Sequence, residues 1–419
     1  MIAVLLVVLA VCGAPLFTII AAAALNGYHQ GGMNISNVVL EVNRIAETPV
    51  LISIPLFTFA GYLLGESKAS RRLVAMSHAL LGWMPGGLAV VTLSACALFT
   101  AFTGASGVTI VALGALLYPA LLTEKYPQNF SLGLITSSGS LGLLFPPAVP
   151  LILYGVISQT SIDKLFAAGV APGVLMVLLL SLYSMGVARR ANIPLQKFHW
   201  PNLGRALRDA AWELPLPVIV FGGVYSGFFA VSEAAAVTAF YVLIVEVFIY
   251  KEVPLRALPG VMRRSMTLVG GILIILGMSL ASTNYMIDRE VPTRLFAFVS
   301  AQISSKFTFL ILLNIFLLIL GCLLDIFSSI VLIVPLLLPI ATNYGINPIH
   351  LGIIFLANMQ IGYCTPPIGM NLFIASYRFK EPVLKLAIST LPFLLILLVV
   401  VLIITYWPSL TLFFTQFVG

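Results

Sequence analysis

The sequence has very little charge for a chain of 419 residues. Only 8% of its residues are Asp, Glu, Lys or Arg, whereas 60% are hydrophobic, and the mean hydropathy is +1.11. Because a soluble domain has about 25% charged residues, this composition excludes a soluble globular protein. It indicates an all-α polytopic membrane protein in which almost the whole chain lies in or on the bilayer.

Cysteine and histidine are also scarce. The four cysteines (Cys12, Cys96, Cys322 and Cys364) all lie in apolar segments without a CxxC pair, which favours small core residues with free thiols. The four histidines are scattered, so we expect no transition-metal site. HExxH and GxSxG motifs are absent, as is a His–Asp pair at a plausible membrane depth, so an intramembrane enzyme is disfavoured.

The long apolar runs predict the membrane spans. Residues 1–25 lack the basic start of a signal peptide, and their apolar run is too long for its core, so we expect a first span there. Further spans are expected near 49–65, 166–188, 214–230, 234–250, 268–287 and 386–406. In 68–84 and 255–267, charged and apolar residues alternate at helical spacing, which predicts helices lying in the membrane interface.

Two longer apolar regions, 86–160 and 307–377, are interrupted by Gly, Pro and polar residues and match each other at an offset of 220 residues. SSGSLGLLFPP (137–147) aligns with ANMQIGYCTPP (357–367), and the polar clusters FTGASGVT (102–109) and LDIFSSIV (324–331) precede them. Adjacent prolines remove backbone donors from a helix. Hydrocarbon tolerates the freed groups only where protein or a water-filled cavity satisfies them, so these helices are predicted to break around a site.

This pattern predicts two transport repeats, each with a hairpin that enters the membrane and returns, followed by a discontinuous helix. Repeat 1 is expected at 86–165, with its hairpin at 86–121 and its broken helix at 128–160. Repeat 2 is expected at 307–380, with its hairpin at 307–342 and its broken helix at 349–377. Scaffold spans and interfacial helices are assigned to 1–85 and 166–306, and a C-terminal span to 381–419.

The positive charges predict that the two repeats are inverted. If Met1 and the opening of the first hairpin face the cytoplasm, 16 of the 21 Lys and Arg residues lie inside and 5 outside, as the positive-inside rule requires. Five crossings then follow, so the second hairpin opens to the outside. This orientation explains the net charge of +7 without a nucleic acid or another anionic partner. Inverted repeats with broken helices are typical of secondary transporters and favour alternating access over a channel.

The chain resembles the large membrane subunit of tripartite ATP-independent periplasmic (TRAP) transporters. The motifs that carry this resemblance are spread along nearly the whole chain: PLFTFAGYLLG (55–65), TGASGVTIVALG (103–114), FGGVYSGFF (221–229), LLDIFSSIVLIVPLLLP (323–339) and GIIFLANMQIGYCTPPIGMNLFIAS (352–376). One departure is Ala148, where relatives often have Ser, so no substrate contact is assigned there.

The resemblance implies a sodium-coupled elevator transporter in the bacterial inner membrane. It also implies a small four-helix membrane subunit and an extracytoplasmic binding protein that delivers an organic acid anion. The alternative is a stand-alone sodium-coupled anion symporter or antiporter that needs no binding protein. Four-carbon dicarboxylates, sialic acids, sugar acids and sulfonates all stay open as substrates.

Residue chemistry predicts one sodium site in each repeat. Carbonyls freed where an arm or half-helix ends carry the negative end of the dipole and, with hydroxyl and amide oxygens, suit Na⁺. The expected sodium ligands are Thr103, Gly104, Ser106, Ser137 and Ser138 in repeat 1, and Asp325, Ser328, Asn358, Gln360 and Thr365 in repeat 2. Half-helix N-termini suit a carboxylate, so substrate contacts are expected at Ser106, Pro147, Ser329, Pro367 and Asn371.

Asp325 is the strongest single candidate, because an intramembrane carboxylate is costly and is a functional hypothesis by default. Glu233 and Glu246 lie near span ends, where a peripheral role or a helix partner is expected. The serines and threonines have an alternative role, since such side chains often hydrogen-bond their own backbone or a neighbouring helix.

Overall fold

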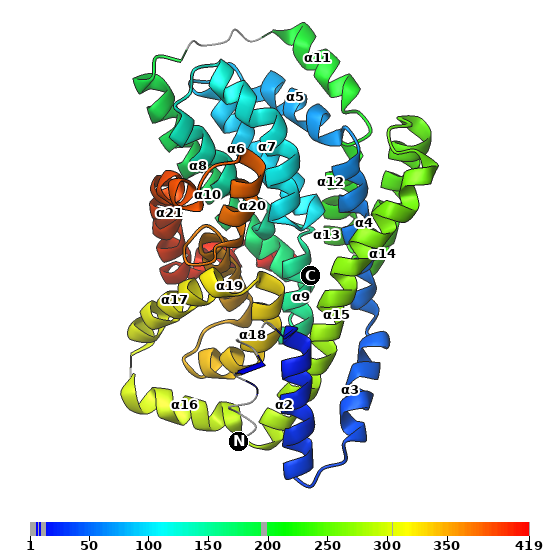
Figure 1. Ribbon diagram of the computed structural model, residues 1–419, viewed down its shortest axis with the longest axis vertical. Coiled ribbons are helices and arrows are strands. Elements are labelled where there is room, and N and C mark those ends of the chain that lie inside the picture. Colours follow the sequence, from blue (N-terminus) through cyan, green and yellow to red (C-terminus); the bar gives the residue numbers. More distant parts are fainter. Residues whose placement is uncertain (1–5, 7, 10–13, 194–198, 304, 419) are drawn as a thin grey trace.

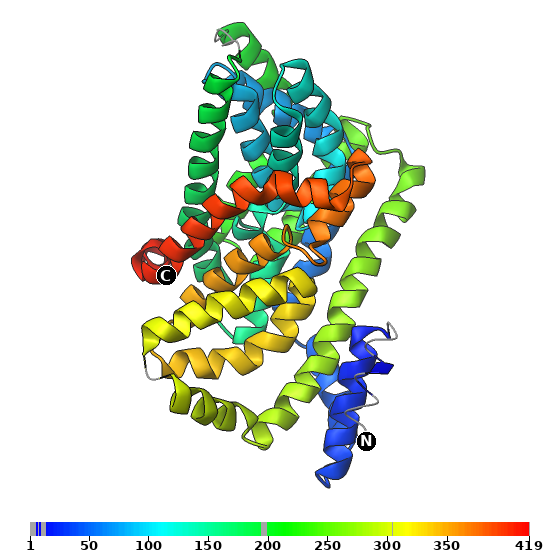
Figure 2. The same ribbon diagram turned by 60° about the vertical axis from the view of Figure 1, so that its left-hand side comes forward.

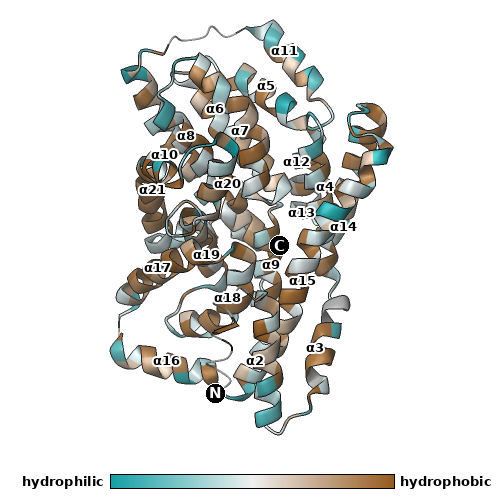
Figure 3. Ribbon diagram, in the orientation of Figure 1, coloured by the Kyte–Doolittle hydropathy of each residue, from teal (hydrophilic) through white to brown (hydrophobic). Residues whose placement is uncertain are grey.

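The computed structural model describes the chain except residues 1–5, 7, 10–13, 194–198, 304 and 419. The described part is helical and contains no strand, which confirms the all-α fold class. Within it, eight helices are long and apolar enough to cross a membrane, and a ninth span results if α8 and α9 are counted together. Figure 3 shows that these helices are hydrophobic along most of their length.

The first expected span, with Cys12, falls partly outside the described residues, and α2 (Leu16–Gln30) covers its second half. The other spans are formed by α4 (Ser53–Glu66), α10 (Ile162–Arg190), α14 (Val231–Leu243), α15 (Leu258–Asp288) and α21 (Val383–Tyr406). The turn of π-helix η4 (Ile244–Ile249) extends α14, and the stretch expected at 214–230 contains α12 (Pro215–Pro217), η3 (Val218–Gly222) and α13 (Gly223–Tyr225).

Two helix pairs occupy the ranges expected for the hairpins. The first pair is α6 (Gly87–Thr103) and α7 (Ser106–Thr123), and the second is α17 (Lys306–Leu323) and α18 (Ile326–Asn343). Gly104 turns the chain between α6 and α7 with a φ of +64°, a conformation that favours glycine. In the second pair, the Asp325 side chain caps α18 instead. The assignment of these pairs to inverted repeats stays a prediction.

Each helix pair is followed by an interrupted helix. The first consists of α8 (Gln128–Ser138), η2 (Leu141–Leu144) and α9 (Val149–Ser158), bent by 43°. The second consists of α19 (Pro348–Gly362) and α20 (Met370–Phe379). Both Pro-Pro bonds, at 146–147 and 366–367, are cis and lie between the half-helices.

The 220-residue offset is also visible in the packing. A Cβ added at Gly142 would lie 2.3 Å from the Ala97 carbonyl oxygen and 2.4 Å from the Ala101 nitrogen. A Cβ added at Gly362 would lie 2.5 Å from the Gly321 Cα. Ala101 and Gly321 are themselves 220 residues apart. In both regions, the interrupted helix therefore presses on the first arm of its own pair. The second arms pack crosswise, α7 on α20 and α18 on α9.

The expectation of a separate interfacial helix at 255–267 is wrong. After the short turn η5 (Leu255–Ala257), α15 runs unbroken for 31 residues, so its basic start and its apolar span are one helix. The helix breakers Pro259 and Gly260 lie in the first turn, where proline is tolerated, so nothing interrupts the helix near residue 267. In contrast, α5 (Ala69–Leu81) is a short separate helix within 68–84.

Three helices lie in stretches where no helix was expected: α3 (Ser36–Ala46), α11 (Trp200–Asp209) and α16 (Val291–Gln302). The remaining short elements are η1 (Pro49–Ile52), α22 (Pro408–Leu412) and η6 (Phe414–Phe417). Figure 1 places α5 and α11 at one end of the molecule and α16 with one end of α2 and α3 at the other. Figures 1 and 2 both show α15 running along one side, away from α21.

Candidate functional site

The tip between α6 and α7 is buried and polar. Thr103 is 1% exposed, and its Oγ1 makes no hydrogen bond to any described residue. Ser106, which begins α7, donates its hydroxyl to Asn371 Oδ1 at 2.7 Å. This bond joins the first tip to α20, which follows the second Pro pair. Two predicted substrate contacts, 265 residues apart in sequence, are therefore neighbours.

Hydroxyl groups that sequence reasoning missed link this tip to the first break. Thr100 and Thr109 face each other across α6 and α7 with their oxygens 2.6 Å apart. Thr100 also donates to the Gly139 carbonyl, directly after α8, at 2.9 Å. Both residues lie about one turn from the predicted tip, one on each arm of the hairpin, and this placement could have predicted their contact.

The serines of the first break mostly hydrogen-bond their own helix. Ser137 donates to the Gly133 carbonyl at 2.7 Å and Ser138 to the Ile135 carbonyl at 3.3 Å. Ser140 lies 3.4 Å from the carbonyl oxygens of Ser137 and Gln360. Because Ser140 and Gln360 are 220 residues apart, the two breaks meet at equivalent positions. Pro147 is buried here.

Asp325 shapes the second tip. Its Oδ1 accepts from the backbone N–H groups of Phe327 and Ser328, both at 3.0 Å, and its Oδ2 accepts from the Ser328 hydroxyl. The Asp325 side chain is therefore the N-cap of α18. Tyr363 accepts from the Ile326 N–H at 2.7 Å, which ties this tip to the second break. Ser329, one turn into α18, is fully buried, and its hydroxyl has no partner among the described residues.

Around the second break, two buried amides are incompletely bonded. Asn358 donates its amide hydrogens to Asn314 Oδ1 at 2.7 Å and to the Ile354 carbonyl at 2.8 Å, leaving its own Oδ1 without a partner. Neither side-chain polar atom of Gln360 has a partner among the described residues. Thr365 donates to the Ile361 carbonyl at 3.0 Å, and Pro367 is exposed.

The Asn358 contact brings in residues that were not predicted. Asn314 on α17 accepts from Asn358 and, at 3.2 Å, from the Thr405 hydroxyl on α21. This packing orients the Asn358 amide with its free oxygen away from Asn314. Within the described part of the chain, Asn358 and Asp325 share no hydrogen bond, so direct hydrogen bonds do not gather all the expected ligands of repeat 2.

Unpartnered buried polar groups concentrate at the predicted site. Among the described residues, those with an unsatisfied buried side-chain atom include Thr103, Ser329, Asn358 and Gln360, with Thr58 on α4 and Thr238 on α14 as the others. Leaving such a group unbonded costs about 1–3 kcal/mol, so a polar ligand or ion is expected there. Within the described part of the chain, no group of three or more His, Cys, Asp or Glu could hold a metal ion. Hydroxyl, amide and carbonyl oxygens nevertheless fit Na⁺.

The strongest charge cluster lies outside these tips and includes Glu246, for which a peripheral role or a helix partner was expected. The helix-partner alternative is correct: Glu246 is fully buried, and its Oε1 lies 3.1 Å from an Arg72 nitrogen on α5. Arg72 also pairs with Glu213 and, at 2.7 Å, with Glu252, while its guanidinium lies over the Tyr250 ring. Since α5 carries Arg72, one side chain joins α5 to the segments that carry Glu213, Glu246 and Glu252.

The pKa values in this cluster reflect burial and pairing. Burial raises the pKa of Glu213 above its ordinary value, and the Arg72 charge opposes that rise. Burial alone would lower the pKa of Arg72. The three glutamates outweigh this effect, so the pKa of Arg72 lies above its ordinary value. Arg72 therefore stays charged and holds the cluster together.

Similarity to known proteins covers almost the whole chain. The family described as "Tripartite ATP-independent periplasmic transporter, DctM component" matches residues 1–410. An isethionate TRAP transporter permease protein of Oleidesulfovibrio alaskensis is 34% identical over 89% of this chain, and the match spans 60% of that protein's length. A C4-dicarboxylate TRAP transporter large permease protein of Rhodobacter capsulatus is 34% identical, with 92% of this chain and 91% of that protein covered.

A solved structure shows the same fold. The crystal structure of the Alcanivorax borkumensis YdaH transporter has a TM-score of 0.66 and 15% sequence identity, covering 89% of this chain and 88% of that chain. The relatives are named as permeases, which agrees with the expectation that this chain is not an enzyme. From the family match and these relatives, the chain belongs to the tripartite ATP-independent periplasmic transporters, as their large permease component.

Proposed function

We propose that this chain is the large membrane subunit of a sodium-coupled secondary transporter that imports an organic acid anion. The observation that carries the proposal is the concentration of unpartnered buried polar atoms at the first tip (Thr103), the second helix pair (Ser329) and the second interrupted helix (Asn358 and Gln360). These groups offer oxygen ligands without soft donors, a set that suits a hard monovalent cation. The sodium ion would supply the coupling energy and partly neutralise an anionic substrate.

The substrate site lies between the two regions in this proposal. Ser106 and Asn371, already joined by a hydrogen bond, are placed to contact the substrate, with the N-terminus of α20 offering N–H groups to a carboxylate or sulfonate. The substrate class is supported by relatives named for C4-dicarboxylates, isethionate and ectoine. The individual substrate is left to experiment.

Transport proceeds by an elevator movement in this proposal. The helix pairs and interrupted helices (86–165 and 307–380) move together, and the spans at 1–85 and 166–306 form the scaffold. The crosswise packing of α7 on α20 and of α18 on α9 supports this division, because it unites the two regions into one body. Thr58 and Thr238 lie on scaffold helices in this proposal.

The proposal includes two protein partners, a small four-helix membrane subunit and an extracytoplasmic binding protein, in the bacterial inner membrane. The test is uptake into liposomes under an inward sodium gradient, by this chain alone, with the small subunit, and with both partners. Sodium-dependent uptake only with both partners supports the proposal. Saturable sodium-driven uptake by the chain alone at micromolar substrate supports the stand-alone symporter instead. Uptake unaffected by sodium contradicts both.

The inverted orientation is tested by labelling. With Met1 in the cytoplasm, single cysteines replacing Lys125 and Lys306 are expected to react with a membrane-impermeant reagent from opposite sides. Both positions lie at the open ends of the helix pairs and are exposed. Labelling of both from one side contradicts the inversion.

A further inference from the structure

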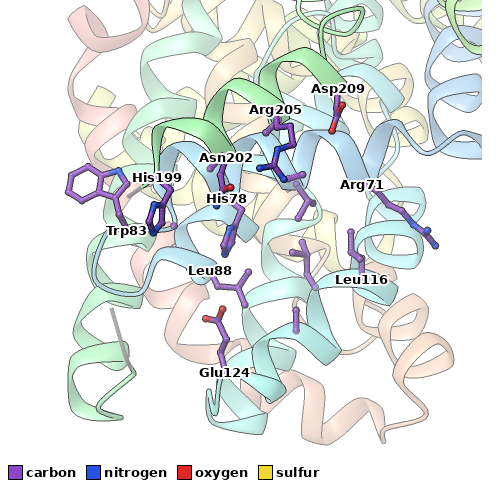
Figure 4. Close-up of a pocket in the computed structure, with 17 residues that line it drawn as sticks. Arg71, His78, Trp83, Leu88, Leu116, Glu124, His199, Asn202, Arg205 and Asp209 are labelled. Atoms are coloured by element: carbon purple, nitrogen blue, oxygen red, sulfur yellow. The ribbon is translucent and has the colours of Figure 1, made fainter. Parts of the chain in front are cut away.

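A cleft of about 620 Å³ lies between α5, α11 and the first helix pair, away from both Pro-Pro breaks. Its lining has two characters. The apolar floor comes from α6 and α7: Leu88, Leu116, Leu117 and Ala120. Polar groups come mainly from α5 and α11: His78, His199, Asn202 and Arg205. Figure 4 shows α11 on one side of the cleft and Leu88 and Leu116 on the other.

The cleft is lined by charges of both signs. Arg71 and Arg205 contribute positive charge, and Glu124 and Asp209 contribute negative charge. Arg205 and Asp209 lie one turn apart on α11, yet neither forms an ion pair with a described residue. Both side chains are exposed, so each can serve a ligand rather than each other. A purely anionic ligand would gain from the arginines and be repelled by the carboxylates.

We propose that this cleft binds a phospholipid with a zwitterionic headgroup that carries a phosphate and a primary amine. The planar guanidinium of Arg205 presents parallel N–H donors that match a phosphate, and His78 lines the same cleft. The carboxylate of Asp209, which lines the same cleft, accepts the hydrogen bonds that a primary ammonium donates. Trp83 lines the cleft and is half exposed, as expected for an indole at the membrane interface.

The surface next to the cleft suits the lipid tails. On α7, the exposed residues Val111, Ala115 and Leu122 lie on one face of the helix, beside the floor residues Leu116 and Ala120. The apolar floor thus continues into an apolar stripe outside the cleft. A headgroup held between α5 and α11 would leave its acyl chains along this stripe. A soluble ligand such as free phosphate would make no use of it.

This proposal is independent of sodium coupling and of the transported substrate. The experiment is native mass spectrometry of the full chain, purified with any partners, after exchange into equimolar phosphatidylethanolamine, phosphatidylglycerol and phosphatidylcholine. Phosphatidylethanolamine is expected to be retained about tenfold over both others, because its amine donates hydrogen bonds and the carboxylates disfavour an anionic lipid. Equal or preferred retention of phosphatidylglycerol overturns the proposal, and so does displacement of the lipid by inorganic phosphate.

Matched variants sharpen the test. Arg205→Gln is expected to lower retention of phosphatidylethanolamine about tenfold, the size of one good charge-assisted contact. Arg208→Gln removes the same charge from an exposed position on the same helix but outside the cleft, and is expected to leave retention unchanged. Asp209→Asn is expected to shift the preference toward phosphatidylglycerol. Equal losses in the Arg205 and Arg208 variants overturn the proposal; if Arg205→Gln does not fold, the Asp209→Asn preference decides.

Discussion

The two interrupted regions share one local design but differ in how they are covered. In the first, Thr103 and Ser106 at the tip and both prolines of the break are buried. In the second, both prolines of the break are exposed, and Leu323 and Ile368 are each 47% exposed. Similar sequences therefore produce similar backbones while the access to them differs.

The difference comes from the contacts that α4 and α15 make with the two helix pairs. A Cβ added at Gly61 of α4 would lie 2.5 Å from both the Phe102 carbonyl oxygen and the Thr103 Cα, so α4 lies directly against the first tip. In the second helix pair, the contact with α15 lies away from the tip: Ser279 of α15 donates to the Val331 carbonyl of α18 at 2.7 Å. Whether a tip is covered thus depends on where α4 or α15 contacts the helix pair. Under the proposed elevator movement, unequal cover of the two breaks is expected of an end state.

The largest expected effect comes from removing Arg72, because α5 packs on α6 and helps to cover the first region. Arg72→Gln leaves the buried carboxylates of Glu213 and Glu246, and the partly buried one of Glu252, without their cation. Breaking a buried ion pair in this way costs about 3–5 kcal/mol. We expect a severe loss of monodisperse protein and of thermal stability. Arg264→Gln is the control, since its pair with Glu66 is exposed and is worth about 1 kcal/mol or less. Similar losses in both variants would contradict the role of burial.

Gly61→Val is expected to uncover the first tip. The added carbons collide with backbone, and overpacking of this kind costs about 1–3 kcal/mol. In a cysteine-free background, we expect faster thiol labelling of Thr103→Cys when Gly61→Val is present. Gly65→Val is the control, because one turn away the nearest contact is a Val108 methyl group at 3.3 Å. Unchanged labelling with Gly61→Val would show that α4 does not control access.

Asp325→Asn separates charge from capping at the more open second tip. Asparagine is also a good N-cap, so the start of α18 is expected to persist while the negative charge is lost. At an effective dielectric constant of 20, a charge 4 Å from a cation contributes about 4 kcal/mol, so the sodium concentration for half-maximal uptake is expected to rise at least about tenfold. Uptake with the parent's sodium dependence would exclude Asp325 from coupling.

Glu246→Gln is the companion to this variant. Because Glu246 is buried against Arg72, its substitution is expected to reduce folded yield, while the protein that does fold keeps its sodium dependence. A shift in sodium dependence without a loss of yield would instead connect the Arg72 cluster to coupling.

The smallest effect is expected where the two regions meet. Ser140→Ala removes two contacts that are both 3.4 Å long, near the limit for a hydrogen bond. We expect less than about a twofold change in uptake, because contacts this long contribute less free energy than the roughly 1 kcal/mol of an ordinary hydrogen bond. A much larger loss would show that the Ser140 hydroxyl binds sodium or substrate.

The sequence predicted where helices break and end better than it predicted the contacts between side chains. The Pro pairs, the tip residues and Gly142 with Gly362 are local signals, and the helices end close to them. The contact of Asn314 and Thr405 with Asn358 joins three helices, and no local pattern announces it. The identity of the helix partner of Glu246 could not be predicted for the same reason, because Arg72 lies 174 residues earlier in the chain.

The helices outside the apolar runs were not predicted. α11 and α16 are short, and each begins with a proline in its first turn, a helix-start signal that lies outside the long apolar runs. At 255–267, charged and apolar residues at helical spacing predict a separate helix in the interface. The same charges can lie at the start of a long apolar helix, as they do in α15.

The Arg72 cluster also constrains the order in which this protein is made. Arg72 is synthesised 141 residues before Glu213, 174 before Glu246 and 180 before Glu252. At about 5–20 residues per second, the last partner follows Arg72 by roughly 10–40 s. During that interval the ribosome also produces α6 to α9, so these helices are made before Arg72 can form all its ion pairs.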